Sequence, residues 1–116
     1  MADKLILTRD MIFGAEDLPR LEVSIPEWHG SVFIRTMTGG ERDRFEAGWK
    51  ADPSTDIRAR LAAATLCDAE GVLLFTGDDV ALLSRKSSKA LDRIFAASTA
   101  HSGLTDRDIE ELRKNS

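Results

Sequence analysis

A predicted β-hairpin over residues 21–35 is the feature that most constrains the fold of this chain. Apolar and polar side chains alternate in residues 21–25, the pattern of a strand with one buried face. Residues 26–30 follow with a proline and a glycine that favour a chain reversal, and residues 31–35 are rich in strand-forming side chains. A two-stranded hairpin is barely stable alone in water, so helices from the rest of the chain must cover its apolar face.

Two helices are predicted directly after the hairpin. Thr38 and Glu41 have the spacing of a capping box, in which their side chains satisfy free backbone N–H groups, so a helix should run from about 39 to 50. Pro53 then breaks the chain. A second helix is expected over about 55–67, where apolar residues occupy most sides, which is typical of a central helix.

Further helices are predicted in the second half of the chain, which contains no proline. Thr76 and the two aspartates after it should cap a short helix at about 80–83. The strongest amphipathic pattern spans about 86–101, with apolar residues at helical spacing. A last short helix should start at Thr105, and the apolar run at 72–75 is interpreted as a strand or a buried connector.

The expected fold class is α+β and mostly helical, with an N-terminal β-hairpin packed on a bundle of about five short helices. The chain has 116 residues, which fits one domain. We expect an irregular N-terminal arm at 1–20, a single α+β domain at 21–113 and a frayed tail at 114–116. One hydrophobic core can form in a chain of this length without metals or disulfides.

Charge and hydropathy exclude some classes of partner. The 16 basic and 20 acidic residues give a net charge of −4, and an acidic surface repels phosphate backbones. No stretch approaches the roughly 20 apolar residues of a membrane span. The apolar run at residues 5–7 is shorter than the roughly 7–15 residues of a signal-peptide core. We therefore expect a cytoplasmic protein that binds neither nucleic acid nor membranes.

The sequence indicates no catalytic machinery. Cys67 is the single cysteine and is interpreted as a small buried hydrophobe. Neither His29 nor His101 has a second ligand at metal-binding spacing, and Asp78 and Asp79 are interpreted as helix caps in preference to a metal pair. We predict a protein that is not an enzyme, with no catalytic residue, metal or cofactor. An enzyme subunit is a lower-ranked alternative.

Aromatic residues are the first candidates for binding another protein. Trp28 lies on the predicted turn, and Phe45 and Trp49 lie one turn apart on an otherwise polar helix. Aromatic side chains in such places often anchor interfaces, although burial in the core is the alternative for each.

A basic stripe is the second candidate for binding. It consists of Arg85, Lys86, Lys89 and Arg93, the last three on one face of the predicted helix. Such a stripe can dock an acidic protein partner, or it can be an ordinary solvated face. A small DNA-binding regulatory protein that uses residues 85–93 is the alternative function, and salt-dependent DNA binding would support it.

Several stretches, in order, also suggest a family. They are residues 6–10, 23–30, 37–46, 67–71, 74–76, 91–95 and 103–105. The most specific are the Pro-Glu-Trp turn at 26–28 and the Thr-Gly-x-Glu-Arg-Asp segment at 38–43. With these stretches the chain resembles the tail assembly chaperones of long-tailed, HK97-type bacteriophages and prophages, over roughly residues 5–115.

The resemblance implies a function through binding. Such proteins are not enzymes; they bind the long helical tape measure protein and keep it soluble while tail tube subunits polymerise around it. They also self-associate, and they act in the cytoplasm of the host bacterium. The expected partners are therefore the tape measure protein, the tail tube protein and further copies of this chain. The resemblance transfers no individual binding residue.

Overall fold

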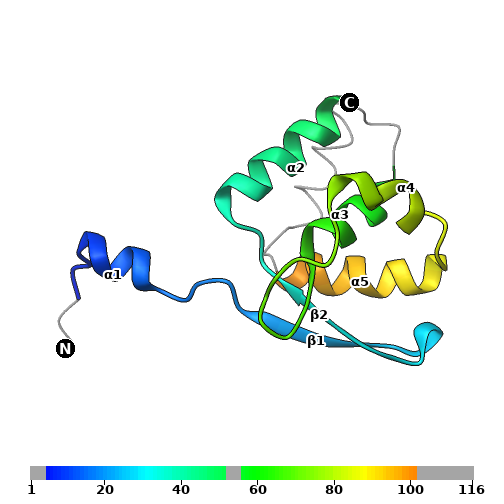
Figure 1. Ribbon diagram of the computed structural model, residues 1–116, viewed down its shortest axis with the longest axis horizontal. Coiled ribbons are helices and arrows are strands. Elements are labelled where there is room, and N and C mark those ends of the chain that lie inside the picture. Colours follow the sequence, from blue (N-terminus) through cyan, green and yellow to red (C-terminus); the bar gives the residue numbers. More distant parts are fainter. Residues whose placement is uncertain (1–4, 52–55, 102–116) are drawn as a thin grey trace.

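The computed structural model describes residues 5–51 and 56–101, apart from the side chain of Trp49. Its elements, in chain order, are α1 (Arg9–Gly14), β1 (Arg20–Ile25), the 3-10 helix η1 (Pro26–Trp28), β2 (Gly30–Arg35), α2 (Gly39–Ala51), α3 (Ile57–Thr65), β3 (Leu66–Cys67), the 3-10 helix η2 (Gly77–Asp79), α4 (Val80–Leu83) and α5 (Ser88–His101). Figure 1 shows α2 to α5 gathered on one side of the sheet, while α1 stands apart. The predicted α+β, mostly helical class is confirmed. The predictions for Thr105 onward lie outside the described residues.

The predicted β-hairpin is confirmed. β1 and β2 pair antiparallel, with Val23 opposite Val32. The reversal is made by η1, which starts at Pro26, and by His29, whose left-handed backbone has a φ of 56°. Ile25 at the end of β1 is fully buried because α5 packs across the hairpin.

The helix predicted over 55–67 is two residues too long at its carboxyl end. α3 ends at Thr65, and the next two residues form β3, which pairs antiparallel with Phe33 and Ile34 of β2. The sheet therefore has three strands in the order β1-β2-β3, where the hairpin alone was predicted. Both residues of β3 are buried, and their pairing with a distant strand outweighs the local helix pattern.

The hydrophobic core lies between the sheet and the helices. Its buried members include Ile25 and Ile34 of the hairpin, Leu66 of β3, and Leu91 and Ile94 of α5. The predicted apolar stripe of α5 therefore faces the core, as expected. A smaller cluster joins α2 to α3 on the other side of α3.

One buried polar pair links the two central helices. The Thr65 hydroxyl donates a hydrogen bond to the Leu61 carbonyl at 2.7 Å and lies 3.0 Å from the Ser98 hydroxyl. Because Thr65 has one proton to donate, Ser98 donates to Thr65 in this arrangement. The pair explains how a serine occupies the apolar stripe of α5 without an unsatisfied polar group.

A largely buried ion pair anchors α2 to the sheet. The guanidinium of Arg35 donates to both carboxylate oxygens of Glu41, at 2.8 and 2.9 Å, and its Nε donates to the Gly71 carbonyl at 2.8 Å. Glu41 also completes the predicted capping box, since Thr38 N donates to Glu41 Oε1 and Glu41 N donates to Thr38 Oγ1. The hydrogen bond from Arg35 holds the pKa of Glu41 at about 2, well below its ordinary value.

Two segments differ from their predictions. The arm predicted to be irregular contains α1, whose first turn is capped by the Thr8 hydroxyl accepting from Met11 N at 3.3 Å. The run at 72–75 is neither a full strand nor a buried connector. A single bridge joins Leu73 to Cys67, and Val72 and Leu74 on either side of it are exposed.

Candidate partner-binding groove

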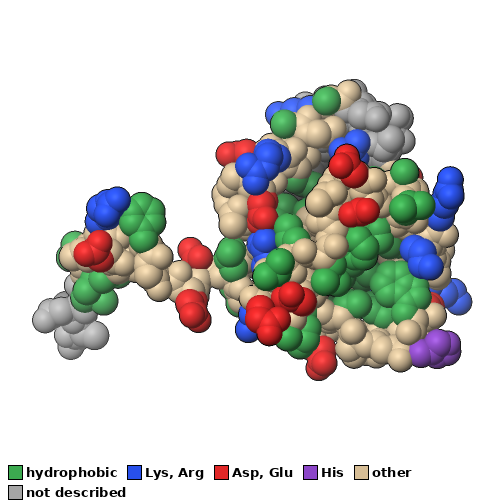
Figure 2. Space-filling model, in the orientation of Figure 1, with side chains coloured by type: hydrophobic (Ala, Val, Ile, Leu, Met, Phe, Trp, Pro, Cys, Tyr) green, Lys and Arg blue, Asp and Glu red, His purple; other side chains and the backbone are tan. Residues whose placement is uncertain are grey.

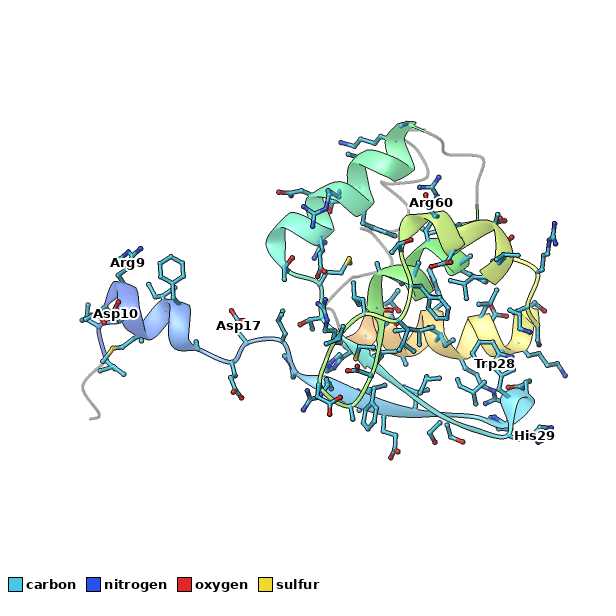
Figure 3. All side chains as sticks on the ribbon, viewed as in Figure 1. Arg9, Asp10, Asp17, Trp28, His29 and Arg60 are labelled. Carbon is cyan, nitrogen blue, oxygen red and sulfur yellow. The ribbon has the colours of Figure 1, made fainter. Side chains whose placement is uncertain are left out.

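A hydrophobic hollow of about 390 Å³ lies between the tip of the hairpin and α4. We call it the tip hollow; it is lined by Trp28, Phe75, Leu82 and Leu83, with Asp79 and Lys86 at its edge. Figure 2 shows hydrophobic side chains gathered in this area, with Lys and Arg side chains along the outer border. Figure 3 places Trp28 at the hairpin end of the area.

The local sequence holds the walls of the tip hollow in place. Thr76 and Asp79 form a capping box at the start of η2, in which Thr76 N donates to Asp79 Oδ2 at 2.8 Å. The predicted capping role of Asp79 is therefore confirmed. In α4, Leu83 is buried against the core while Leu82 is 62% exposed, so one side of this short helix faces the solvent.

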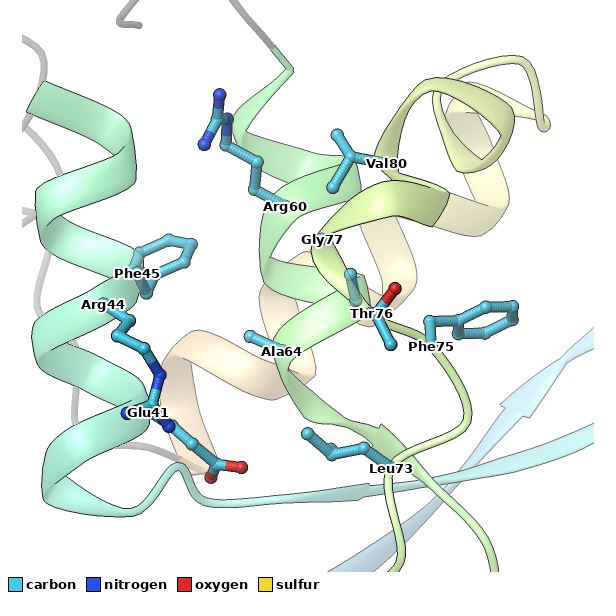
Figure 4. Close-up of a pocket in the computed structure, with 11 residues that line it drawn as sticks. Glu41, Arg44, Phe45, Arg60, Ala64, Leu73, Phe75, Thr76, Gly77 and Val80 are labelled. Carbon is cyan, nitrogen blue, oxygen red and sulfur yellow. The ribbon is translucent and has the colours of Figure 1, made fainter. Parts of the chain in front are cut away.

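A second hollow of about 500 Å³ adjoins the first one, between α2, α3 and the loop before η2 (Figure 4). We call it the helix hollow; its apolar wall is formed by Phe45, Ala63, Ala64, Leu73, Phe75 and Val80, and Glu41, Arg44 and Arg60 contribute polar atoms. Phe75 lines both hollows. We refer to the two hollows, which share Phe75 as a wall and carry charged residues in their linings, as the apolar groove.

The three predicted aromatic anchors, Trp28, Phe45 and Trp49, have different outcomes in the structure. Trp28 is half-buried: it packs on the core and lines the tip hollow. Phe45 is 9% exposed, packs with Ile57 and Leu61, and shows one edge to the helix hollow. The side chain of Trp49 lies outside the described residues, so its predicted role stays a prediction.

The basic stripe does not lie on one helix face. α5 begins at Ser88, so Arg85 and Lys86 belong to the turn before it, and the expectation of a helix from residue 86 is corrected. The turn is held by Lys86 N donating to the Leu83 carbonyl at 3.0 Å. Lys86 reaches the tip hollow, while Lys89 is exposed on α5.

Arg93, the last residue of the stripe, is engaged with the hairpin. Its Nε and Nη2 donate to the carboxylate of Glu27 at 2.8 and 3.2 Å. The hydrogen bond from Arg93 lowers the pKa of Glu27. This exposed ion pair links α5 to η1 beside Trp28, so Arg93 positions the tip hollow and is not a free cation for a partner.

Among the residues that the structure describes, the cysteine and the two histidines lie apart from one another. Cys67 is 2% exposed, and burial raises the pKa of its thiol, which lowers its thiolate fraction. His29 is exposed on the turn, and His101 Nε2 lies 2.7 Å from the Pro19 carbonyl. Within residues 5–51 and 56–101, no group of three or more His, Cys, Asp or Glu side chains could hold a metal ion.

Sequence reasoning missed several residues of the groove, above all Phe75 and Leu82. The apolar run at 72–75 was the available indication, because a stretch without strand alternation next to a turn is a candidate for a partly exposed loop. Its neighbours in the groove come from the hairpin tip and α4, which only the tertiary structure brings together.

No family model, curated protein or solved structure matches this chain. None of the described helices combines the length and the hydropathy needed to cross a lipid bilayer.

Proposed function

We propose that this chain is a tail assembly chaperone of a long-tailed phage or prophage. It binds the tape measure protein in the host cytoplasm, keeps it soluble and helps recruit tail tube subunits. The observation that carries the proposal is the apolar groove. In its tip hollow, Trp28, Phe75 and Leu82 lie next to one acidic and one basic side chain, Asp79 and Lys86. The sequence resemblance supplies the identity of the partner.

The shape of the groove suits a helical partner. An amphipathic helix presents apolar side chains at positions i, i+3, i+4 and i+7, which fill successive hollows of a hydrophobic groove. Here the tip hollow and the helix hollow adjoin at Phe75, so two such anchors can be received. A long apolar helix aggregates in water unless its face is covered, and many weakly bound copies along it gain from multivalency.

The alternative function, DNA binding through residues 85–93, has less support from the described contacts. Arg93 is paired with Glu27, and the whole chain carries a net charge of −4. Binding of duplex DNA at physiological ionic strength, weakening steeply with added salt, would favour this alternative.

Leu82→Asp should weaken binding of the tape measure protein by tenfold or more, because it places a charge in the tip hollow where an apolar anchor is expected, and central anchors contribute about 2 kcal/mol or more. Leu82 is 62% exposed, so the thermal midpoint should change little. The measurement is the affinity for the tape measure protein of the same phage or prophage, by titration or co-purification.

Leu74→Asp is the matched control, since Leu74 is 53% exposed and lines neither hollow. Its binding should equal that of the natural chain. Equal affinity for both variants would remove the groove as the binding site.

A further inference from the structure

The N-terminal arm carries most of the exposed large hydrophobic side chains of the described residues. The described chain has eleven large hydrophobic side chains that are exposed, and seven of them lie in residues 5–18. Phe13 is 74% exposed and Ile12 is 55% exposed, both on α1. Figure 1 shows α1 clear of the domain at the end of an extended segment. A hydrophobic surface of this kind marks an interaction site.

α1 is too short to be stable on its own contacts. It has six residues, whereas isolated helices shorter than about 12–15 residues are marginal in water. Its local support is the Thr8 cap and the Arg9 guanidinium 4.9 Å from the Phe13 ring centre. A helix held by these contacts needs a surface that covers its apolar side chains.

The arm cannot easily reach the tip hollow of its own domain. It joins the sheet at Arg20, at the opposite end of β1 from Trp28 (Figure 3). β1 has six residues and is about 20 Å long. The linker at 15–19 spans at most about 18 Å when fully extended. To reach the tip hollow of its own domain, the linker would have to lie almost fully extended along the whole strand, whereas a second copy meets no such limit.

The arm and the tip hollow are complementary in polarity and charge. α1 offers aromatic and aliphatic side chains, and the tip hollow is lined by apolar ones. Glu16 and Asp17 follow α1, and Lys86 lines the tip hollow together with Asp79, with Arg85 next to Lys86 in the chain. Figure 2 shows acidic side chains along the linker and basic side chains at the far border of the domain.

We propose that α1 of one copy docks in the tip hollow of a second copy, with Ile12 and Phe13 as its anchors. The two surfaces of the contact differ, so each copy can give its arm to one neighbour and receive the arm of another. This contact between copies does not depend on the proposed function. If the proposed function holds as well, the arm of a neighbour occupies the tip hollow until the tape measure helix displaces it.

The first test is the mass of the full chain in solution over a range of concentrations, by sedimentation. The natural chain should rise above the 12.8 kDa of a single copy as concentration increases. The double variant Ile12→Ser, Phe13→Ser should stay at that mass. The control is Val72→Ser, Leu74→Ser, which removes similar exposed apolar surface outside the arm and the hollows and should associate like the natural chain.

The second test is complementation. Leu82→Asp blocks the tip hollow, so it should be monomeric by itself, as should the arm variant. Mixed together, the intact arm of one and the intact hollow of the other should form a one-to-one dimer and nothing larger. Circular dichroism should show the same helix content for every variant.

Three outcomes would overturn the proposal. The natural chain could be monomeric at every concentration, or the Leu82→Asp variant could still self-associate. The third is that the mixture of the Leu82→Asp variant and the arm variant forms no dimer. A natural chain that self-associates through its arm but does not bind the tape measure protein would count against the proposed function alone. Tighter tape measure binding by the arm variant than by the natural chain supports competition for the same hollow.

Discussion

Glu41→Gln should destabilise the protein by about 3 kcal/mol at pH 7, because it leaves the charge of Arg35 poorly paired. The Arg35 side chain is 9% exposed and the Glu41 side chain is 20% exposed, so water replaces little of the lost attraction. The amide can still accept the hydrogen bond from Thr38 N, so the helix cap is kept. Urea unfolding followed by circular dichroism measures the change.

The same ion pair predicts how stability depends on pH. The pKa of Glu41 is about 2 in the folded protein, below its ordinary value of 4.5, so protons bind the unfolded chain more tightly. The ionised Glu41 contributes about 3 kcal/mol to the free energy of unfolding. This contribution is fully present above about pH 4.5 and is lost as the pH falls to about 2. Glu41→Gln should lack this part of the acid dependence.

Glu46→Gln is the matched control for both measurements. Glu46 lies on the same helix and pairs with Arg42 at 3.1 Å, but both side chains are more than one-third exposed. An exposed pair of this kind contributes about 0–1 kcal/mol. Equal losses for Glu41→Gln and Glu46→Gln would contradict the special role of the buried pair.

Leu91→Ala should cost about 2–5 kcal/mol, which is a large part of the roughly 5–15 kcal/mol that stabilises a domain. Leu91 is 5% exposed and belongs to the core cluster of α5, the sheet and α3. Truncation removes buried surface and leaves a cavity that the neighbouring side chains fill only in part. Chemical unfolding curves measure the loss.

Leu82→Ala is the control for this truncation, because it makes the same chemical change at a side chain that is 62% exposed. Its cost should stay within about 0.5 kcal/mol. A Leu91→Ala variant as stable as Leu82→Ala would show that α5 is not the helix that closes the core.

The features that were predicted correctly depend on residues that are close in sequence. The hairpin follows from alternation and from the turn at 26–30, within fifteen residues, from 21 to 35. The capping boxes at Thr38 and Thr76 each need a partner three residues later. The stripe of α5 repeats at helical spacing. In each case the interacting groups meet because of local backbone geometry.

The candidate site was predicted only in part. Trp28 and Lys86 were named as candidates, and both line the tip hollow. Arg93 was expected to meet a partner, but it meets Glu27 of the same chain. Phe75 gave no indication by itself, because its exposure depends on which elements pack against the loop that carries it.

The amino-acid sequence by itself determined α2 to α5, the hairpin and the apolar faces that must be covered, since propensity, capping and periodicity act over a few residues. The tertiary structure decided that Leu66 and Cys67 form a strand, that Arg35 and Glu41 pair within reach of Gly71, and that Trp28 and Phe75 share one hollow. These outcomes depend on contacts between distant segments, whose free energy is gained only when the whole chain is packed together.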